Sequence, residues 1–204
     1  FPVSPLTYSA ATFYQFNVSW SDNIAIQTVK IQHNFTGTMA NYSVSGNVGS
    51  VYFYNYTGIP AGGYVWQMIG NDSFGNTNQT DFYNYVVNKA SSSVNLTLNG
   101  VDGNITVQVG NNNVNLSALR LGGEGNIKLF RNGTLINEGQ PTISNLSNFT
   151  VLGDYNITVI YEETQNFTSS SRTNFLFVID NLFPNITLNS PINGYNSSSR
   201  SAVF

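Results

Sequence analysis

The sequence contains no cysteine and very little charge. Charged residues make up 8% of its 204 residues, with 7 Lys and Arg against 10 Asp and Glu, whereas a usual soluble domain has about 25%. Without cysteine there is no disulfide scaffold, so burial of apolar side chains has to stabilise the fold. The net charge of −3 and the lack of a basic cluster argue against a nucleic-acid-binding surface. Solvation of the surface therefore depends on uncharged polar side chains.

The residues that most enzymes need are also scarce. His33 is the single histidine, so it alone could serve as the base of a Ser-His-Asp triad, and we expect it to be structural or exposed. Zinc requires three or four His or Cys ligands, which the chain cannot supply. Glu162 and Glu163 are adjacent at a predicted strand end and point to opposite faces, which makes them a poor carboxylate pair for glycoside hydrolysis. The sequence predicts a protein that is not an enzyme and binds no cofactor.

Long apolar runs and helical periodicity are missing as well. No run reaches the ~18 residues of a membrane-spanning helix, and no segment repeats apolar residues with a period of 3.6. The chain begins at Phe1 without an initiator Met or a signal-peptide pattern. We therefore expect a mature or partial chain, with any export signal or anchor outside it.

A period of two runs through most of the chain instead. In residues 14–20, aromatic and aliphatic residues alternate with Gln15, Asn17 and Ser19, which is typical of a half-buried strand. About seven such strands fall in residues 1–89 and a second set in 90–181, with the polar stretch 88–93 between them. This pattern predicts an all-β protein of two tandem immunoglobulin-like β-sandwiches, with domains at 1–89 and 90–181.

Local signals support this fold class. Asn132-Gly133 between two apolar strands predicts a type I′ hairpin. Tyr64 and Tyr155 each follow shortly after Gly at the start of a strand, like the corner tyrosine of immunoglobulin sandwiches, whose hydroxyl holds the preceding turn. The inward-facing residues predict one core from Tyr14, Phe16, Val18, Trp20, Tyr64 and Trp66, and another from Leu96, Val107, Tyr155, Ile157, Val159 and Phe177.

What the sequence has in excess is the triplet Asn-x-Ser/Thr. Sixteen occur, none with Pro in the middle, whereas random placement of the 31 Asn and 40 Ser and Thr would give roughly six. They begin at Asn17, Asn34, Asn41, Asn55, Asn71, Asn78, Asn95, Asn104, Asn115, Asn132, Asn145, Asn148, Asn156, Asn166, Asn185 and Asn196. Each is a formal N-glycosylation acceptor.

Many of these sequons lie on predicted strands, where Asn and the hydroxyl residue share the outer face. A plain polar strand face is the alternative interpretation, although Asn is depleted in strands. The excess favours an extracellular chain that carries N-glycans. We expect sugar above all at the outward strand positions, which are Asn17, Asn95, Asn104, Asn115, Asn156 and Asn185.

The last segment, residues 182–204, repeats the start of the chain. Ser190-Pro191-Ile192 matches Ser4-Pro5-Leu6. We expect this segment to be the first strands of a further module, or a donor strand for a neighbouring subunit. Its assembly residues would be the apolar Ile186, Leu188, Ile192, Val203 and Phe204.

Two other functions remain open from the residues. Asp22 and Asp72 lie in predicted turns and are weak calcium candidates, although Asx turns use the same residues for backbone geometry. Aromatic runs on two strands could form a carbohydrate-binding face, although core packing also uses such residues. These runs are Tyr52, Tyr54, Tyr56 and Tyr83, Tyr85.

Several motifs resemble known surface proteins. Trp20-Ser21-Asp22-Asn23 and Tyr64-Val65-Trp66 in the first half resemble Ig-like modules of archaeal surface glycoproteins. Gly153-Asp154-Tyr155 and Gln165-Asn166-Phe167-Thr168 in the second half resemble the Ig-like type-3 repeats of bacterial and archaeal surface proteins. The resemblance implies stalk, filament, adhesin or cell-coat modules without catalytic residues.

Together these features predict a structural protein of the cell surface. Its partners would be copies of itself or neighbouring repeats in a fibre, joined by strand donation or by covalent repetition. The alternative is an adhesin that recognises surface glycans or other cells through an aromatic strand face.

Overall fold

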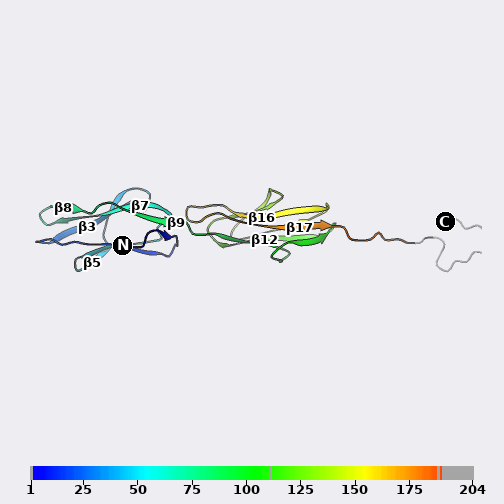
Figure 1. The fold of residues 1–204 in the computed structure, drawn as a ribbon, viewed down its shortest axis with the longest axis horizontal. Coiled ribbons are helices and arrows are strands. Elements are labelled where there is room, and N and C mark those ends of the chain that lie inside the picture. The colour runs from blue at the N-terminus through cyan, green and yellow to red at the C-terminus, as the bar shows by residue number, and fades with distance from the viewer. Residues whose placement is uncertain (1, 111, 188, 190–204) are drawn as a thin grey trace, which may run out of the picture.

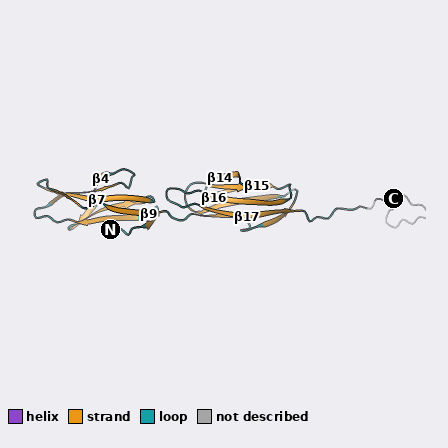
Figure 2. Cartoon of the chain, turned by 45° about the horizontal axis from the view of Figure 1, so that its top comes forward, coloured by secondary structure: helices purple, strands orange, loops and turns teal. Residues whose placement is uncertain are grey.

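A computed structural model describes residues 2–110, 112–187 and 189 of the chain. All regular structure in this part is β-strand (Figure 2), which confirms the all-β prediction. Two β-sandwiches follow each other end to end along the long axis, and residues 180–187 run away from the second one (Figure 1). We call them the N-terminal sandwich (residues 2–88) and the C-terminal sandwich (residues 93–179).

The N-terminal sandwich is built from nine strands. They are β1 (Leu6–Thr7), β2 (Phe13–Ser19), β3 (Ile26–His33), β4 (Ala40–Ser43), β5 (Gly46–Val48), β6 (Val51–Thr57), β7 (Gly62–Asp72), β8 (Thr77–Gln79) and β9 (Tyr83–Asn88). One sheet has the order β1-β9-β7-β3-β4, with β8 also paired to β7, and the other has the order β2-β6-β5. The short β1 runs parallel to β9, and the other pairings are antiparallel.

The C-terminal sandwich is built from eight strands. They are β10 (Ser93–Leu98), β11 (Ile105–Gln108), β12 (Asn113–Gly122), β13 (Ile127–Arg131), β14 (Thr134–Gly139), β15 (Thr142–Asn148), β16 (Gly153–Tyr161) and β17 (Ser170–Ile179). One sheet has the order β11-β17-β16-β13-β14, and the other has the order β10-β12-β15. Here the first strand, β10, pairs over its whole length with β12.

Each sandwich encloses its own hydrophobic core, as the alternating pattern predicts. In the first, Tyr14, Phe16 and Trp66 are buried, and Val18, Trp20 and Tyr64 pack against them partly exposed. In the second, Leu96, Ile157 and Val159 are fully buried, and Val107 and Tyr155 pack at the margin.

The prediction for Phe177 was wrong. Leu176 and Val178 fill the inner face of β17, so Phe177 between them points outward and stacks on Phe175 at 6.4 Å. Asn174 occupies an inner position of the same strand, where its Nδ2 donates to the carbonyl oxygen of Leu96 at 2.8 Å. That hydrogen bond satisfies the polar group and lets it share the apolar face.

Two predicted local devices are confirmed. The hydroxyls of Tyr64 and Tyr155 donate to the carbonyl oxygens of Pro60 and Val151, each four residues upstream. The β13–β14 hairpin turns at Asn132-Gly133, with φ of 48° and 78°. Two positive φ values in succession are what a type I′ turn needs.

Candidate glycan-bearing and assembly surfaces

The sequon asparagines lie mainly on solvent-facing positions of the strands and turns. Of the six predicted as outward, Asn104, Asn115, Asn156 and Asn185 are exposed, whereas Asn17 and Asn95 are half-buried. Asn196 lies outside the described residues. The sequon at Asn156 shows the expected geometry, because its own hydroxyl residue Thr158 donates to Asn156 Oδ1 at 2.6 Å on the same strand face.

In many sequons the amide oxygen, and not the amide nitrogen, is bound to the protein. Asn104 Oδ1 accepts from the backbone N–H of Phe175 at 2.8 Å, and Asn132 Oδ1 accepts from the N–H of Asn156 at 2.8 Å. Asn34 does the same with the N–H of Val65 at 2.8 Å. A backbone N–H can only donate, so these contacts fix which end of each amide faces the protein. They leave Nδ2, the atom that carries an N-linked sugar, without a protein acceptor.

Three of the fifteen sequons in the described part of the chain behave differently, because their Nδ2 donates within the protein. Asn71 Nδ2 donates to Gln27 Oε1 at 3.2 Å and to the Asp72 carbonyl at 3.4 Å. Asn145 Nδ2 donates to the Ile136 carbonyl at 3.4 Å, and Asn166 Nδ2 donates to the Glu124 carboxylate at 3.3 Å and 3.4 Å. These three amides are engaged as hydrogen-bond donors.

The Asn145 sequon is also turned inward. Ile143 and Phe149 are buried on β15 and just after it, so the strand period places Asn145 and Ser147 on the same inner side. Leu146, the middle residue, is 68% exposed. The expectation that Asn and the hydroxyl residue of a strand sequon share the outer face is therefore wrong at this position.

The two sandwiches differ at the edge of their smaller sheet. In the C-terminal sandwich, β12 is covered by β10, whose Leu96 and Leu98 are fully buried. In the N-terminal sandwich, β2 occupies the position of β12 but pairs only with β6 among the described strands. One edge of β2 is open to an added strand.

A groove follows the C-terminal half of this open edge. It has a volume of about 280 Å³ and is lined by Val18, Ser19, Trp20 and Ser21 on one side and by Asn78, Gln79 and Thr80 on the other. Val18 and Trp20 are half-buried and expose part of their apolar surface there. The groove therefore offers apolar side chains beside unpaired backbone groups.

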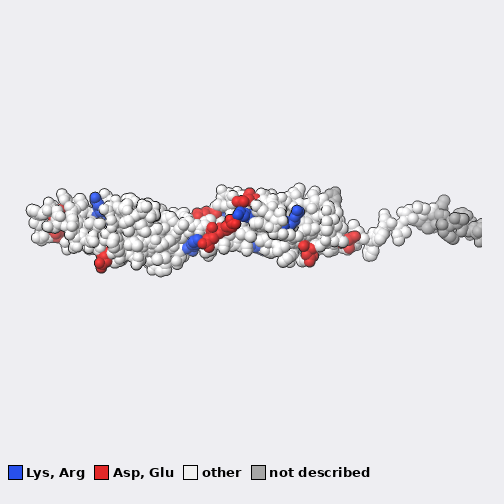
Figure 3. Space-filling model, turned by 90° about the horizontal axis from the view of Figure 1, so that it is seen from above, with Lys and Arg blue, Asp and Glu red and all other residues white. Residues whose placement is uncertain are grey.

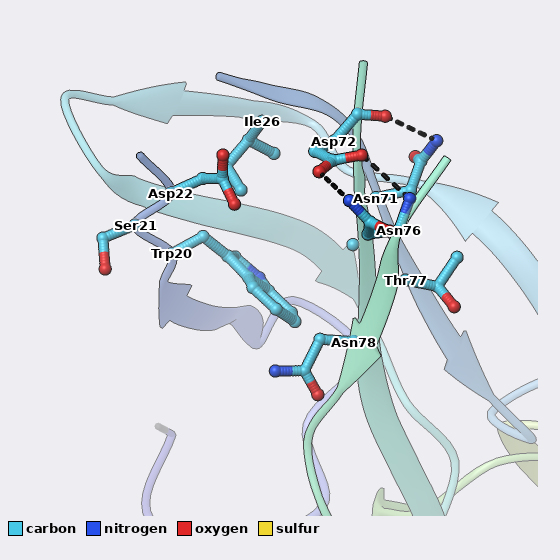
Figure 4. Close-up of a pocket in the computed structure, with 10 residues that line it drawn as sticks. Trp20, Ser21, Asp22, Ile26, Asn71, Asp72, Asn76, Thr77 and Asn78 are labelled. Atoms are coloured by element: carbon cyan, nitrogen blue, oxygen red, sulfur yellow. Dashed lines mark hydrogen bonds between the residues drawn. The ribbon is translucent and has the colours of Figure 1, made fainter. Parts of the chain in front are cut away.

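Trp20 also lines a second, smaller cavity of about 130 Å³, which contains both calcium candidates (Figure 4). Asp72 is buried, and its carboxylate accepts from the N–H groups of Phe74 at 2.9 Å and Asn76 at 2.8 Å and from Asn76 Nδ2 at 2.7 Å. These hydrogen bonds, the one from the Asn76 side chain foremost, lower the pKa of the Asp72 carboxyl. Asp22 Oδ1 accepts from the N–H of Ile24 at 2.8 Å. Both carboxylates hold turns.

His33 lies in the core of the N-terminal sandwich. Its ring is fully buried and stacks on Phe35 at 4.0 Å and on Tyr42 at 4.3 Å, with Tyr54 and Tyr56 beside it. Its Nδ1 accepts from the N–H of Phe35 at 3.2 Å. Burial lowers the pKa of His33 to about 4, and the structural interpretation of this residue is confirmed.

The tyrosine runs do not form an open platform. Tyr52, Tyr54 and Tyr56 on β6 pack against the core with partial exposure, and Tyr85 is 2% exposed. Tyr83 is more open, with its ring 5.1 Å from that of Trp66. These positions match the core-packing interpretation of the aromatic runs.

The adjacent glutamates Glu162 and Glu163 make separate ion pairs. Glu162 pairs with Lys128 at 2.7 Å, whereas Glu163 pairs with Lys89, so the two carboxylates do face different partners. Within the described ranges, no group of three or more His, Cys, Asp or Glu side chains could hold a metal ion. No helix in this part of the chain is long and apolar enough to cross a membrane.

The start of the C-terminal segment is extended and makes little contact with the rest. Leu182, Phe183 and Ile186 are 72%, 93% and 89% exposed. The other predicted assembly residues, which are Leu188, Ile192, Val203 and Phe204, lie outside the described residues. Three large apolar side chains therefore lie in solvent within five residues of this segment.

Comparison with known proteins finds no sequence relative and only distant similarity to solved structures. No protein-family model and no curated protein matches the sequence. The chain is similar to the fibronectin(III)-like modules of Clostridium thermocellum CbhA, with 14% identity, a TM-score of 0.34 and coverage of 91% of this chain and 97% of that one. It is also similar to the amphioxus IgVJ-C2 molecule, with 16% identity, a TM-score of 0.34 and coverage of 83% and 98%. The strand order of the described residues, and not these matches, defines the class as an all-β chain of two tandem sandwiches.

Proposed function

We propose that this chain is an N-glycosylated extracellular structural protein without enzymatic activity, and that it forms a surface filament or stalk by donating its C-terminal segment to the next copy. The observation that carries the proposal is a match between the edge position beside β2, which no described strand fills, and a sequence in the tail. Asn185-Ile186-Thr187-Leu188-Asn189 repeats Asn95-Leu96-Thr97-Leu98-Asn99, with a single Leu-to-Ile change.

The residues 95–98 belong to β10, the strand that covers β12. The sequons Asn115-Leu116-Ser117 on β12 and Asn17-Val18-Ser19 on β2 align the two acceptor strands. In the C-terminal sandwich, Leu96 pairs with Ala118, Thr97 with Ser117 and Leu98 with Leu116. Carried over to a neighbouring copy, this register puts Ile186 beside Trp20, Thr187 beside Ser19 and Leu188 beside Val18.

That register brings the two inward apolar residues of the tail to the groove lined by Val18 and Trp20. The added strand would satisfy the open backbone groups of β2 and remove Ile186 from water, which is the energetic basis of strand addition. Donation from one copy to the next is a heterologous contact, so it propagates into an open fibre. If the chain continues, the same residues would open a third sandwich of a covalent stalk.

The sugar coat is proposed from the amide geometry. Most of the sequons in the described ranges leave Nδ2 without a protein acceptor, and several hold Oδ1 on the backbone. With only 8% charged residues, a layer of covalent sugar supplies the solvation that charge gives to other surface proteins. The chain would then be extracellular, with copies of itself as its main partners.

The alternative, an adhesin that binds carbohydrate on an aromatic strand face, has weaker support. The tyrosines of β6 pack into the core, and the groove beside β2 has the apolar floor and open edge that a strand needs. Binding of free oligosaccharides to the purified chain without any fibre would favour the adhesin.

The test compares residues 1–204 with a chain that ends at Asp180. Size-exclusion chromatography and negative-stain electron microscopy should show head-to-tail oligomers for the first and monomers for the second. Ile186→Asp should abolish the oligomers, whereas Asn189→Asp, which adds the same charge at an outward position of the same segment, should retain them. Equal, monomeric behaviour of all four chains would refute strand donation.

A further inference from the structure

The junction between the two sandwiches is formed by the loop between β16 and β17, residues 162–169. The N–H of Ala90 donates to the Asn166 carbonyl at 2.9 Å, and the N–H of Thr168 donates back to the Ala90 carbonyl at 2.9 Å. The polar stretch 88–93 between the two sandwiches is therefore bound to this loop. Phe167 adds an edge-to-face contact with Tyr8 of the N-terminal sandwich, with ring centroids 5.7 Å apart.

One side chain in this loop connects both sandwiches. Asn166 Oδ1 accepts from the N–H of Ala61 at 3.0 Å, in the turn before β7. Its Nδ2 donates to both carboxylate oxygens of Glu124, in the loop between β12 and β13. Glu124 is itself held, because its N–H donates to the Tyr161 hydroxyl at 3.1 Å.

The residues around the Asn166 side-chain amide are themselves buried or hydrogen-bonded, so they restrict its movement. Ala61 is 2% exposed, its carbonyl accepts from Gln165 Nε2, and Asn166 is half-buried between the two partners. Lys89 Nζ donates to the Thr164 carbonyl at 2.7 Å and pairs with Glu163. On the face shown in Figure 3, acidic and basic side chains gather at this junction and beyond it, whereas the N-terminal sandwich shows few.

We propose that Asn166 is a clamp that fixes the two sandwiches relative to each other, and that its sequon, Asn166-Phe167-Thr168, therefore stays unmodified in the folded protein. N-glycosylation would replace a hydrogen of Nδ2 by a sugar carbon at the atom that donates to Glu124. A sugar attached to Nδ2 would also have to pass between Ala61 and Glu124 to reach solvent. It would therefore push the two sandwiches apart at the junction. The second half of this proposal rests on the proposed glycosylation of the other sequons, whereas the clamp does not.

A clamp of this kind matters to a fibre because each copy would otherwise bend at residues 88–93. The backbone hydrogen bonds, the Asn166 amide, the ion pair and the aromatic contact all lie at this junction. Together they hold the two sandwiches as one rigid unit. Strand donation at the tail would then add rigid units of constant length.

The test uses two variants that separate the amide from the sequon. Thr168→Ala destroys the sequon and keeps the Asn166 side chain, while Asn166→Ala removes both. The clamp predicts that Thr168→Ala has the same small-angle scattering profile as the wild type. Asn166→Ala should show a broader distribution of maximum dimensions and roughly tenfold faster proteolysis at residues 88–93, as expected when a closed junction loses its hydrogen bonds.

A third variant tests the contact with Glu124. Asn166→Asp keeps the acceptor for Ala61 and places a second carboxylate against Glu124, so it should behave as Asn166→Ala at pH 7.

Site-resolved mass spectrometry of the protein from its native host completes the test. Unmodified Asn166 beside modified Asn104 and Asn156 supports the proposal, and sugar on Asn166 overturns it. Identical flexibility of Asn166→Ala and Thr168→Ala would overturn the clamp. A chain without sugar at any sequon would refute the glycosylation of the proposed function, while the comparison of the two variants would still decide the clamp.

Discussion

The hydroxyl of Tyr64 donates to the carbonyl oxygen of Pro60 at 2.7 Å, across the turn that leads into β7. Tyr155 makes the same contact with Val151 at 3.0 Å before β16. The two sandwiches differ in strand number and in their edges, yet each holds the entry to a central strand in the same way. The same turn contains Ala61, whose N–H donates to Asn166 Oδ1. The Tyr64 hydrogen bond therefore also holds the backbone that Asn166 contacts.

Removing this hydroxyl should weaken the N-terminal sandwich. Tyr64→Phe leaves the ring in place and the Pro60 carbonyl without its donor, so we expect a loss of about 1 kcal/mol in the free energy of unfolding. Urea unfolding followed by tryptophan fluorescence measures it, because both tryptophans belong to this sandwich. Tyr52→Phe is the matched control, since its hydroxyl makes no hydrogen bond within the described residues. Equal losses in both variants would contradict the role of the Tyr64 contact.

His33 should make the N-terminal sandwich sensitive to acid. Burial lowers the pKa of His33 from 6.5 to about 4, so the folded state resists a proton that the unfolded state accepts. The stabilisation is complete above about pH 6.5, falls as the pH decreases to about 4 and levels off below that. The full difference corresponds to about 3 kcal/mol.

The check is urea unfolding of the wild type and of His33→Phe at pH 7 and pH 4. The variant retains a flat ring between Phe35 and Tyr42 and loses the hydrogen bond from the Phe35 N–H, so it should be less stable at pH 7 by about 1 kcal/mol. It should nevertheless lose less stability than the wild type between the two pH values. A wild type and a variant with the same pH dependence would show that His33 does not titrate in this way.

The glycan pattern should follow the amide geometry rather than the sequon rule. Asn104 just before β11, Asn132 in the β13–β14 hairpin and Asn156 on β16 are exposed and leave Nδ2 without a protein acceptor, so we expect high occupancy there. Asn145 faces inward and donates to Ile136, so we expect it to be bare. Peptide mapping by mass spectrometry with site localisation measures the occupancy of each sequon. Sugar on Asn145 together with an unmodified Asn104 would contradict the prediction that occupancy follows the hydrogen bonding of Nδ2.

The local features of the fold were predictable because they depend on neighbouring residues. The type I′ turn at Asn132-Gly133 requires two positive φ values. The Gly residues before Tyr64 and Tyr155 lie within corners that the tyrosine hydroxyl closes over four residues. The period of two also placed most core residues, because only one face of each strand can be apolar.

The failures have equally physical causes. Phe177 lies outside because a hydrogen-bonded Asn174 shares the inner face of β17 with Leu176 and Val178. Sequence alternation cannot reveal a buried asparagine whose partner, Leu96, lies 78 residues away. Asn166 looked like one more acceptor site, because its contact with Ala61 joins residues 105 positions apart.

The open edge of β2 could not be predicted from the sequence for a related reason, because it depends on how distant strands pair. The sequence shows that the tail repeats the start of the chain, but the acceptor edge appears only when the two sandwiches are compared. β10 covers β12, and no described strand covers β2. The repeat of residues 95–99 at 185–189 then connects the tail to that edge.

A disulfide in trans tests strand donation most directly, because the natural chain has no cysteine. One preparation carries Ser19→Cys and another carries Thr187→Cys, and the two are mixed under mild oxidation. The register derived from Thr97 and Ser117 predicts a cross-linked dimer in the mixture, whereas each preparation alone should remain uncross-linked. Replacing Ser19→Cys by Ser43→Cys, on the exposed edge strand β4, should give none. A mixture that cross-links no more than this control would contradict donation of the tail to β2.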